Sequence, residues 1–296
     1  MSNIDTLCTE RFSCGEGPLW VPKTRELYWT DSDGKSIRCY SDKLGTWKEI
    51  SNGIHASSLV LHSDGGLVYG SKTGFYHLDE SMNIRSIAEQ FENRPITNIN
   101  DIIADPVGRV YGGQECFDPD GDYETGNLYR IDLDGKVSVI EDGLHLSNGM
   151  GFSPDLAFFY LVDTIARNIY VYDFDEKKGS ISNKKVLATL KRSEGLPDGL
   201  TVDSDGFVWV AMFLGSGLIR FDPDGKIERK IDLECAQPTS LTFGGKDLNE
   251  IFVTSASMYW ETSLAPENHD YNKPRGGELY RIKQEVIGKV EYLAKI

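Results

Sequence analysis

Six positions in the sequence carry an oxygen-bearing side chain in the same local setting, two residues before the first apolar residue of a short predicted strand. Two of them are carboxylates and two are carboxamides, the donors that a hard divalent cation prefers in proteins. None is Cys or His, which argues against a structural zinc site. The six residues are Glu16, Ser57, Asn100, Asn148, Asp198 and Thr239. Their pattern predicts a cation site if the fold brings them together.

Turn chemistry is the alternative explanation for these residues. The triplets Ser147-Asn148-Gly149 and Pro197-Asp198-Gly199 are ordinary turn sequences, and either one alone favours a turn. Turns would also accept Gly, Pro or Lys at this position, whereas all six repeats carry an oxygen donor there. The recurrence therefore favours the metal interpretation.

The elements that position these residues are short strands in a repeating unit. Apolar alternation and Asp/Gly turns dominate the chain, and no amphipathic helix of ten or more residues stands out. The strands that follow the six positions begin at Pro18, Leu59, Ile102, Met150, Leu200 and Leu241, at intervals of 41, 43, 48, 50 and 41 residues. This is the length of one four-stranded propeller blade. We therefore expect an all-β, six-bladed β-propeller with a metal site in its central channel.

The ends of the chain are expected to complete the ring. By the general habit of propellers, residues 7–12 should add a strand to the last blade, which protects the sheet edges. No linker or low-complexity segment divides the chain, so residues 1–296 are predicted to form a single propeller domain.

Composition narrows the partners. A net charge of −15 and a pI near 4.8 argue against a nucleic-acid partner. No apolar run reaches the ~18 residues of a membrane span, and the first twelve residues lack the blocks of a signal peptide. The five cysteines are scattered in a way that fits neither a disulfide framework nor a zinc ribbon, so we expect reduced thiols and a cytoplasmic location.

Ordered motifs give the chain a resemblance to a known family. The motifs are CGEGPLW at residues 14–20, ND at 100–101 with DPVGR at 105–109, SNGM at 147–150 with SPD at 153–155, and PDG at 197–199. In these segments the sequence resembles the SMP-30/gluconolactonase/luciferin-regenerating-enzyme family. The resemblance runs from about residue 14 to residue 281.

The resemblance implies a propeller that holds one divalent cation and hydrolyses sugar lactones. Glu16, Asn148 and Asp198 match the protein ligands of the family, while Asn100 and Asp101 match residues that face the substrate. Ca²⁺ is the expected ion, and Zn²⁺, Mg²⁺ and Mn²⁺ are alternatives because oxygen-only ligand sets accept them. The expected partner is a small-molecule lactone, bound by a monomer or weak homo-oligomer.

Two segments depart from the family pattern. The family commonly carries an Arg two residues before the Asn-Asp pair, where this chain has Asn98, so a bidentate charged donor has become a neutral amide. Residues 114–118 (QECFD) replace the usual Gly-Thr-Met pattern. These departures affect the prediction of the substrate more than the prediction of the metal site.

Roles in catalysis follow as hypotheses. Asp198 is the first candidate to take a proton from the attacking water, and Asp101 is the alternative base. Asn98 and Asn100 would orient substrate hydroxyls, and Asp118, in an exposed acidic loop, would edge the pocket.

Two other functions stay open at this stage. The chain could be a calcium-binding regulatory propeller without turnover, in which the metal is purely structural. It could also be a metal-dependent arylesterase or phosphotriesterase with a more apolar pocket. Aromatic residues that leave the second function open are Phe117, Tyr123, Phe213, Tyr259 and Trp260.

Overall fold

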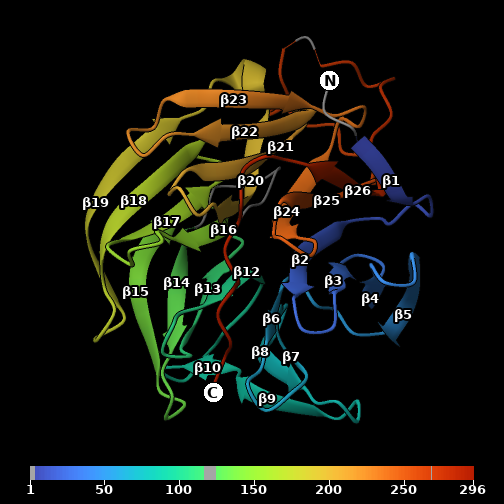
Figure 1. The fold of residues 1–296 in the computed structure, drawn as a ribbon. Helices are drawn as coiled ribbons and strands as arrows, with labels where there is room; N and C mark the ends of the chain where they lie inside the picture. Colours follow the sequence, from blue (N-terminus) through green and yellow to red (C-terminus); the bar gives the residue numbers. More distant parts are fainter. Residues whose placement is uncertain (1–3, 117–124, 268) are drawn as a thin grey trace.

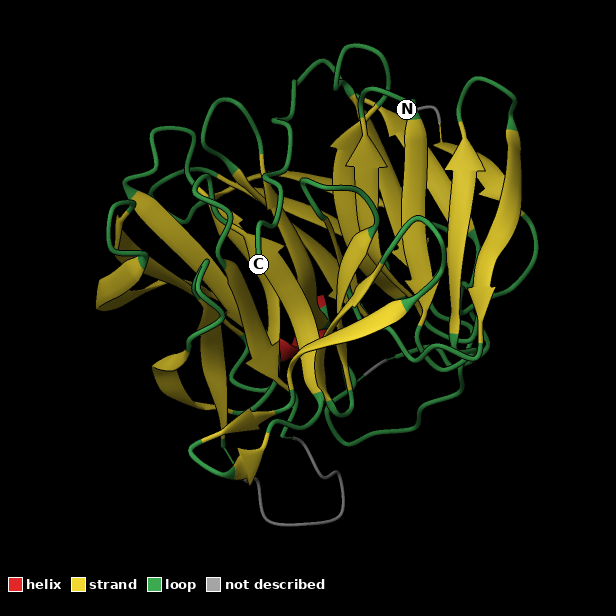
Figure 2. Cartoon of the chain, turned by 90° about the horizontal axis from the view of Figure 1, so that it is seen from below, coloured by secondary structure: helices red, strands yellow, loops and turns green. Residues whose placement is uncertain are grey.

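The computed structural model describes residues 4–116, 125–267 and 269–296, and strands dominate it (Figure 2). Within these ranges the one helix is a single 3₁₀ turn, η1 (Arg192–Glu194). No helix of the described chain has the length and apolarity needed to cross a bilayer. The prediction of an all-β chain is confirmed.

Six four-stranded antiparallel sheets form the blades of a propeller (Figure 1). Blade 1 is β2 (Gly15–Val21), β3 (Glu26–Asp31), β4 (Ser36–Ser41) and β5 (Thr46–Asn52). Blade 2 is β6 (Leu59–Leu61), β7 (Leu67–Ser71), β8 (Gly74–Leu78) and β9 (Ile84–Ala88). Blade 3 is β12 (Ile99–Ala104), β13 (Val110–Gln114), β14 (Gly126–Ile131) and β15 (Val137–Leu144). A small hairpin of β10 (Gln90–Phe91) and β11 (Arg94–Pro95) lies between blades 2 and 3 in the sequence.

The second half of the chain repeats this plan. Blade 4 is β16 (Ser147–Phe152), β17 (Phe158–Asp163), β18 (Asn168–Asp175) and β19 (Ser180–Thr189). Blade 5 is β20 (Leu196–Val202), β21 (Val208–Phe213), β22 (Gly217–Phe221) and β23 (Ile227–Asp232). Blade 6 is β24 (Pro238–Gly244), β25 (Glu250–Ser255), β26 (Leu279–Lys283) and β1 (Ile4–Cys8). The innermost strands contact one another in order around the axis, and β24 contacts β2 to complete the ring.

The ring is closed by the first strand of the chain. β1 pairs with β26, as Ile4 faces Ile282 and Thr6 faces Tyr280. The prediction that the N-terminal segment completes the last blade is confirmed, but its bounds were wrong, since the strand is Ile4–Cys8 and not residues 7–12. The chain leaves the ladder after Cys8, and Phe12 is then buried with its N–H bonded to the Gly277 carbonyl.

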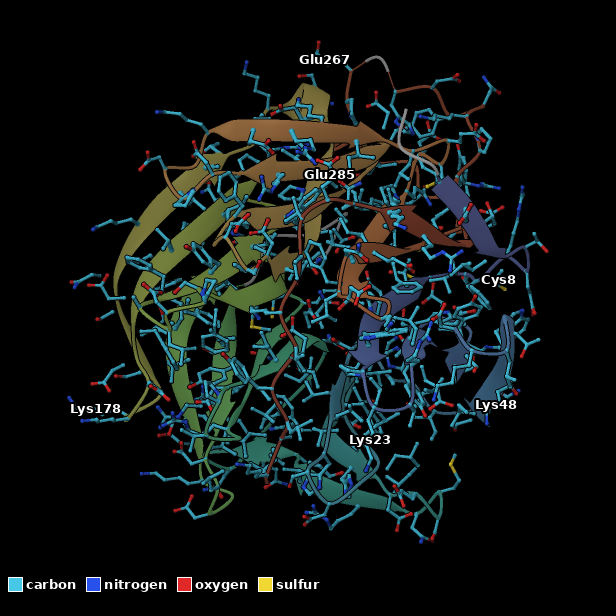
Figure 3. The ribbon with its side chains drawn as sticks, in the orientation of Figure 1. Cys8, Lys23, Lys48, Lys178, Glu267 and Glu285 are labelled. Atoms are coloured by element: carbon cyan, nitrogen blue, oxygen red, sulfur yellow. The ribbon has the colours of Figure 1, made fainter. Side chains whose placement is uncertain are left out.

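Apolar side chains fill the spaces between blades. Trp20 of blade 1 stacks on Phe252 of blade 6 with ring centroids 5.2 Å apart, and Trp209 of blade 5 meets Phe243 of blade 6 edge-on at 6.0 Å. Charged side chains such as Lys48, Lys178 and Glu267 lie at the outer edge of the molecule (Figure 3). The core is thus a set of apolar layers between neighbouring blades.

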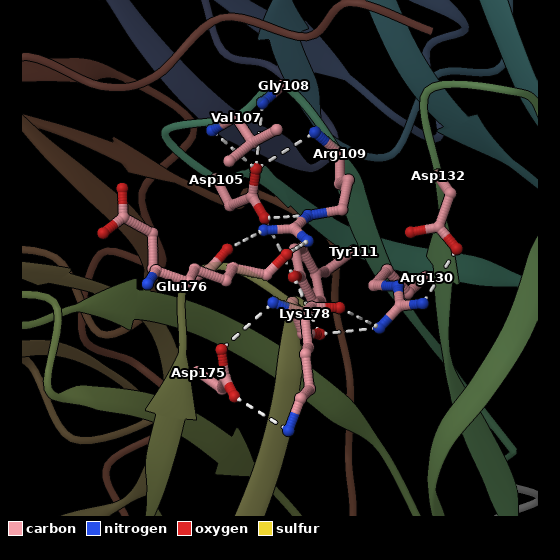
Figure 4. A network of polar contacts seen from close by, with 12 residues as sticks. Asp105, Val107, Gly108, Arg109, Tyr111, Arg130, Asp132, Asp175, Glu176 and Lys178 are labelled. Atoms are coloured by element: carbon pink, nitrogen blue, oxygen red, sulfur yellow. Dashed lines mark hydrogen bonds and ion pairs between the residues drawn. The ribbon is translucent and has the colours of Figure 1, made fainter.

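A buried charge network ties blade 3 to blade 4 (Figure 4). One carboxylate oxygen of Asp105 accepts hydrogen bonds from three successive backbone N–H groups, those of residues 107–109. Its other oxygen accepts from the Arg109 guanidinium and the Tyr111 hydroxyl. The same guanidinium donates to the carbonyls of Glu176 and Lys177 in the β18–β19 turn. The network fixes the relative position of two neighbouring blades.

Changing Asp105 to Asn should lower the free energy of unfolding by about 3 kcal/mol, because the buried Arg109 charge loses its counter-ion. Chemical denaturation followed by tryptophan fluorescence measures the change. The matched control is Asp175→Asn, since Asp175 pairs with Lys178 at the surface, where that lysine side chain is 78% exposed. Equal stability of the two variants would contradict the role given to the Asp105 network.

The last residues of the chain form a C-terminal strap, which we define as residues 284–296. It runs across the middle of the propeller (Figure 1) and contacts loops that follow the innermost strands of several blades. The Ile287 carbonyl accepts from the Ser204 N–H, Ala294 exchanges hydrogen bonds with Leu61 and Ser63, and the Lys295 N–H donates to the Gly108 carbonyl. The strap therefore covers the end of the channel at which the innermost strands finish.

Candidate metal and active site at the channel mouth

The six predicted positions come together at the opposite end of the channel, where the innermost strands begin. They all line one cavity of about 330 Å³, which we call the mouth cavity. Five of them lie in β2, β12, β16, β20 and β24, and the sixth, Ser57, lies just before β6. The prediction that equivalent positions of six repeats converge is confirmed.

The backbone at these positions is strand rather than turn. In five blades the pairing of the innermost strand with its neighbour is interrupted at this register, for example between Ser147 and Met150 and between Pro197 and Leu200. Such irregularities re-aim side chains and are common beside active sites. Residues 147–149 and 197–199 therefore lie within β16 and β20, and the alternative interpretation of these triplets as turns is wrong.

Two glycines of these triplets serve close packing. A Cβ atom on Gly149 would lie 2.0 Å from the Leu200 nitrogen, and one on Gly199 would lie 2.1 Å from the Ser240 hydroxyl. Neighbouring innermost strands approach too closely here for any side chain. The close approach of the innermost strands thus explains the glycine that follows Asn148 and the one that follows Asp198, and neither needs a turn.

Three of the six side chains donate to the backbone of the next blade. The Ser57 hydroxyl donates to the Ile99 carbonyl at 2.6 Å, and the Asn100 amide donates to the Ser147 carbonyl at 3.1 Å. The Thr239 hydroxyl donates to the Gly15 carbonyl at 2.5 Å. These residues hold adjacent blades together, which gives Ser57 and Thr239 a structural reason to be polar.

Asp198 differs from these residues because it has no proton to donate when ionised. Its side chain is buried, at 7% exposure, and its Oδ1 atom has no hydrogen-bond partner among the described residues. A buried, unpaired carboxylate oxygen is costly, and a cation would remove that cost. Glu16 presents a second carboxylate, whose Oε2 accepts from the Gly17 N–H at 3.0 Å.

Asn148 supplies a neutral oxygen beside them. Its amide nitrogen donates to the Thr164 hydroxyl at 3.2 Å, and that hydroxyl donates to the Pro197 carbonyl at 2.8 Å. Because the nitrogen is engaged, the carbonyl oxygen remains as the acceptor. The described residues contain no group of three His, Cys, Asp or Glu that could hold a metal. A cation here would therefore need the Asn148 oxygen together with Glu16 and Asp198, and these three residues fit a hard ion.

Burial dominates the electrostatics of the site. Burial raises the pKa of Glu16 well above its usual value, and the charges of Asp198 and Asp101 raise it further. Burial likewise raises the pKa of Asp198, and the charge of Asp101 raises it further, while the neighbouring Asn148 amide acts in the opposite direction. The pKa of Asp101 is also raised by burial, against hydrogen bonds from Ser58 and the Ile102 N–H. These carboxylates favour either protons or a cation.

The other predicted site residues lie in different places. Asp101 lines a separate cavity of about 60 Å³ deeper in the channel, where Ser58 donates to it. Asn98 is exposed and does not line the mouth cavity, although its carbonyl accepts from the Glu115 N–H at 2.8 Å. Asp118 lies outside the described residues.

One wall of the mouth cavity is apolar. It consists of Leu196, Phe213, Met258 and Trp260, and the Phe213 and Trp260 ring centroids are 5.8 Å apart. Tyr259, one of the aromatic residues that left an arylesterase or phosphotriesterase function open, is 59% exposed and does not line the cavity. Phe117 and Tyr123 lie outside the described residues.

Sequence reasoning missed the acidic side of the cavity, which includes Asp33 and Glu115. Both residues follow the second strand of a blade, β3 and β13 respectively. Because the second strand runs antiparallel to the innermost one, its end returns to the mouth. Extending each repeat through its first hairpin would have found both residues.

Known proteins resemble this chain over most of its length. Residues 14–257 match the family model described as SMP-30/Gluconolactonase/LRE-like region. Pentonolactonase XacC of Haloferax volcanii is 32% identical over 293 residues, which cover 99% of this chain and 97% of that protein. Regucalcin of Danio rerio is 33% identical over 260 residues, covering 86% and 88%. A solved luciferin-regenerating enzyme superposes with a TM-score of 0.89 at 27% identity, covering 100% of both chains. The span of the family match includes all six channel positions.

Proposed function

The chain belongs to the SMP-30/gluconolactonase/LRE-like family, and from this premise we propose that it is a metal-dependent lactonase that hydrolyses a sugar (aldono-)lactone to its acid. The observation that carries the proposal is the unpaired, buried Asp198 oxygen in a cavity shared with Glu16 and Asn148. A relative that is similar along nearly the whole chain is named a pentonolactonase, which supports the substrate class.

Glu16, Asn148 and Asp198 would hold the cation, with Ca²⁺ the expected ion and Zn²⁺, Mg²⁺ or Mn²⁺ as alternatives. When bound, the ion supplies Lewis-acid stabilisation of the negative charge that develops on the lactone carbonyl oxygen. Binding requires both carboxylates to be ionised. The burial that raises their pKa values thus makes the ion a replacement for protons.

Asp198 is the first candidate for the base that takes a proton from the attacking water, since its carboxylate faces the mouth cavity. Asp101 is the second candidate, and it would act from the deeper cavity. Asn100 has committed its amide nitrogen to the Ser147 carbonyl, so its oxygen is the group that would accept a substrate hydroxyl. Asn98 and Asp118 are the other two residues proposed to contact the substrate.

The test is hydrolysis of a lactone panel with and without EDTA. We expect acid release from D-glucono-δ-lactone, L-arabinono-lactone or D-xylonolactone, loss of that release with EDTA, and recovery when divalent metal is added back. A pH indicator in weak buffer follows the reaction. Turnover that persists after complete metal removal would contradict the proposal, as would the absence of turnover on every lactone.

A second candidate function rests on the apolar wall formed by Leu196, Phe213, Met258 and Trp260. This wall would suit an aryl ester or an organophosphate, and the same metal would serve. Faster turnover of phenyl acetate or paraoxon than of any sugar lactone would favour that function. Calcium binding without turnover of any of these substrates would favour a regulatory propeller.

We further propose that residues 1–296 act as one domain in the cytoplasm, as a monomer or weak homo-oligomer. None of the five cysteines forms a disulfide in the described part of the chain, which suits a reducing compartment. Light scattering across a concentration series tests the oligomeric state.

A further inference from the structure

The mouth cavity carries one sign of charge. Four carboxylates line it, those of Glu16, Asp33, Glu115 and Asp198. Among the described lining residues there is no Lys, Arg or His to balance them. A bound divalent cation would offset the two charges of Glu16 and Asp198, and the charges of Asp33 and Glu115 would then have no cationic partner among the lining residues. A cleft lined by charges of one sign concentrates the field that these charges produce.

Glu115 is held in position by its backbone. Its N–H donates to the Asn98 carbonyl at 2.8 Å, and an isolated bridge pairs the residue with Leu146, another lining residue. Its side chain forms no hydrogen bond or ion pair with the described part of the chain. Glu115 is exposed at the mouth, yet the protein atoms around its carboxyl desolvate that group enough to raise its pKa. The charge of Lys72 lowers this pKa and the charge of Asp33 raises it, and Lys72 makes no ion pair with Glu115 in the described part of the chain. The carboxylate is thus positioned for a ligand rather than for the fold.

The two sides of the cavity differ in chemistry. The wall that contains Phe213 and Trp260 offers aromatic faces, on which the C–H face of a sugar ring can pack. The carboxylates of Asp33 and Glu115 offer only hydrogen-bond acceptors, which suit hydroxyl donors. An uncharged polyhydroxylated ring satisfies both sides. A ring bearing a carboxylate or phosphate would bring like charges close together at the mouth, where Asp33 and Glu115 are exposed to solvent.

We propose that Glu115, together with Asp33, determines the charge specificity of the site. Glu115 accepts hydrogen bonds from the hydroxyls of an uncharged sugar lactone and repels lactones that carry a carboxylate or a phosphate. The inference rests on the proposed lactonase function and narrows its substrate class. The same charges also favour release of the product, because the acid formed by hydrolysis is an anion.

The test compares wild type with Glu115→Gln, which keeps the size of the side chain and removes its charge. The substrates are D-glucono-1,5-lactone, its 6-phosphate and D-glucaro-1,4-lactone, which bears a free carboxylate, all at a fixed concentration of free metal. Wild type should prefer the uncharged lactone in kcat/KM. In Glu115→Gln the ratio of uncharged to anionic kcat/KM should fall about tenfold, and KM for the uncharged lactone should rise. Asp33→Asn should shift the ratio in the same direction.

The matched control is Glu80→Gln, which removes the same charge from an exposed residue in the β8–β9 turn, at the far end of the blade. It should leave the ratio at the wild-type value. Added NaCl should reduce the wild-type preference, because salt screens the repulsion. Melting temperatures of all variants establish that they are folded.

The outcomes separate the two proposals. If wild type hydrolyses lactones with metal but treats uncharged and anionic substrates alike, charge specificity is overturned and the lactonase function stands. If the ratio of uncharged to anionic kcat/KM is the same in Glu115→Gln as in wild type, the role assigned to Glu115 is overturned and the lactonase function stands. If wild type hydrolyses no lactone at all, the proposed function fails and this inference fails with it.

Discussion

Changing Asp198 to Ala should abolish lactone hydrolysis, with kcat/KM at least about 10³-fold below wild type. The substitution removes one of two carboxylates proposed to hold the cation and the first candidate for the base, so both functions are lost together. Initial rates in metal-saturated buffer measure the loss of hydrolysis. Calorimetric titration with Ca²⁺ measures the loss of metal binding. A variant that keeps both lactonase activity and bound metal would refute the assignment.

Two further variants separate ligand from base. Asp101→Asn removes the alternative base while leaving Glu16, Asn148 and Asp198 in place, so metal binding should persist. If Asp198 is the base, this variant keeps most of its activity. Loss of activity with metal still bound would instead assign the base to Asp101. Asp247→Ala removes an exposed carboxylate from the β24–β25 turn and serves as the control that should change neither readout.

Without metal, the carboxyl groups of this site should contribute less to the free energy of unfolding as pH rises, which is the reverse of the usual trend for carboxyl groups. Burial raises the folded-state pKa values of Glu16, Asp198 and Asp101 above those of the unfolded chain, which are about 4. Between the unfolded and folded values, the folded state holds protons that the unfolded state has released. The contribution of these groups to the free energy of unfolding is therefore greatest at low pH and is lost as pH rises through the folded values. In EDTA, their contribution should fall from pH 5 to pH 8.

A bound cation should cancel this trend, because it occupies the carboxylates in place of protons. At a metal concentration about 1,000 times the dissociation constant, binding should add about 4 kcal/mol to the free energy of unfolding. Calorimetric melts at pH 5, 6, 7 and 8, each in EDTA and in Ca²⁺, isolate the site from other titrating groups. The gain from Ca²⁺ should grow with pH and should vanish in the double variant Glu16→Gln, Asp198→Asn. A gain that is independent of pH would contradict the electrostatics described above.

The register of the repeats was enough to predict which residues meet. Glu16, Asn148 and Asp198 lie far apart in the sequence. A rotational repeat places equivalent positions at equal height around one axis, so the spacing of the repeats predicts that these residues line one cavity. The local backbone was not predictable in the same way. Asn-Gly and Asp-Gly are typical of turns, and only the close approach of adjacent strands explains why Gly149 and Gly199 lie inside strands.

The cavity wall was harder to predict because each loop has its own length. Asp33 and Glu115 are separated from the channel positions of their blades by a whole hairpin, so their place depends on where β3 and β13 end. The apolar wall draws Met258 and Trp260 from a long segment between β25 and β26, for which no repeat supplies a register. Architecture therefore predicts which residues meet at the channel mouth, whereas the apolar wall, which draws on a segment without a repeat register, needs coordinates.

The pairing of β1 with β26 has a consequence for how the chain folds. Asp5 and Arg281 form an ion pair across this ladder although they are 276 positions apart. Contacts of such long range make folding slow, since the loop must close before the contact stabilises anything. Until β26 is available, β1 has no partner and the last blade presents open edges that can pair with other chains. Dilute conditions and time for late ring closure should therefore decide the yield of refolding more than the stability of any one blade.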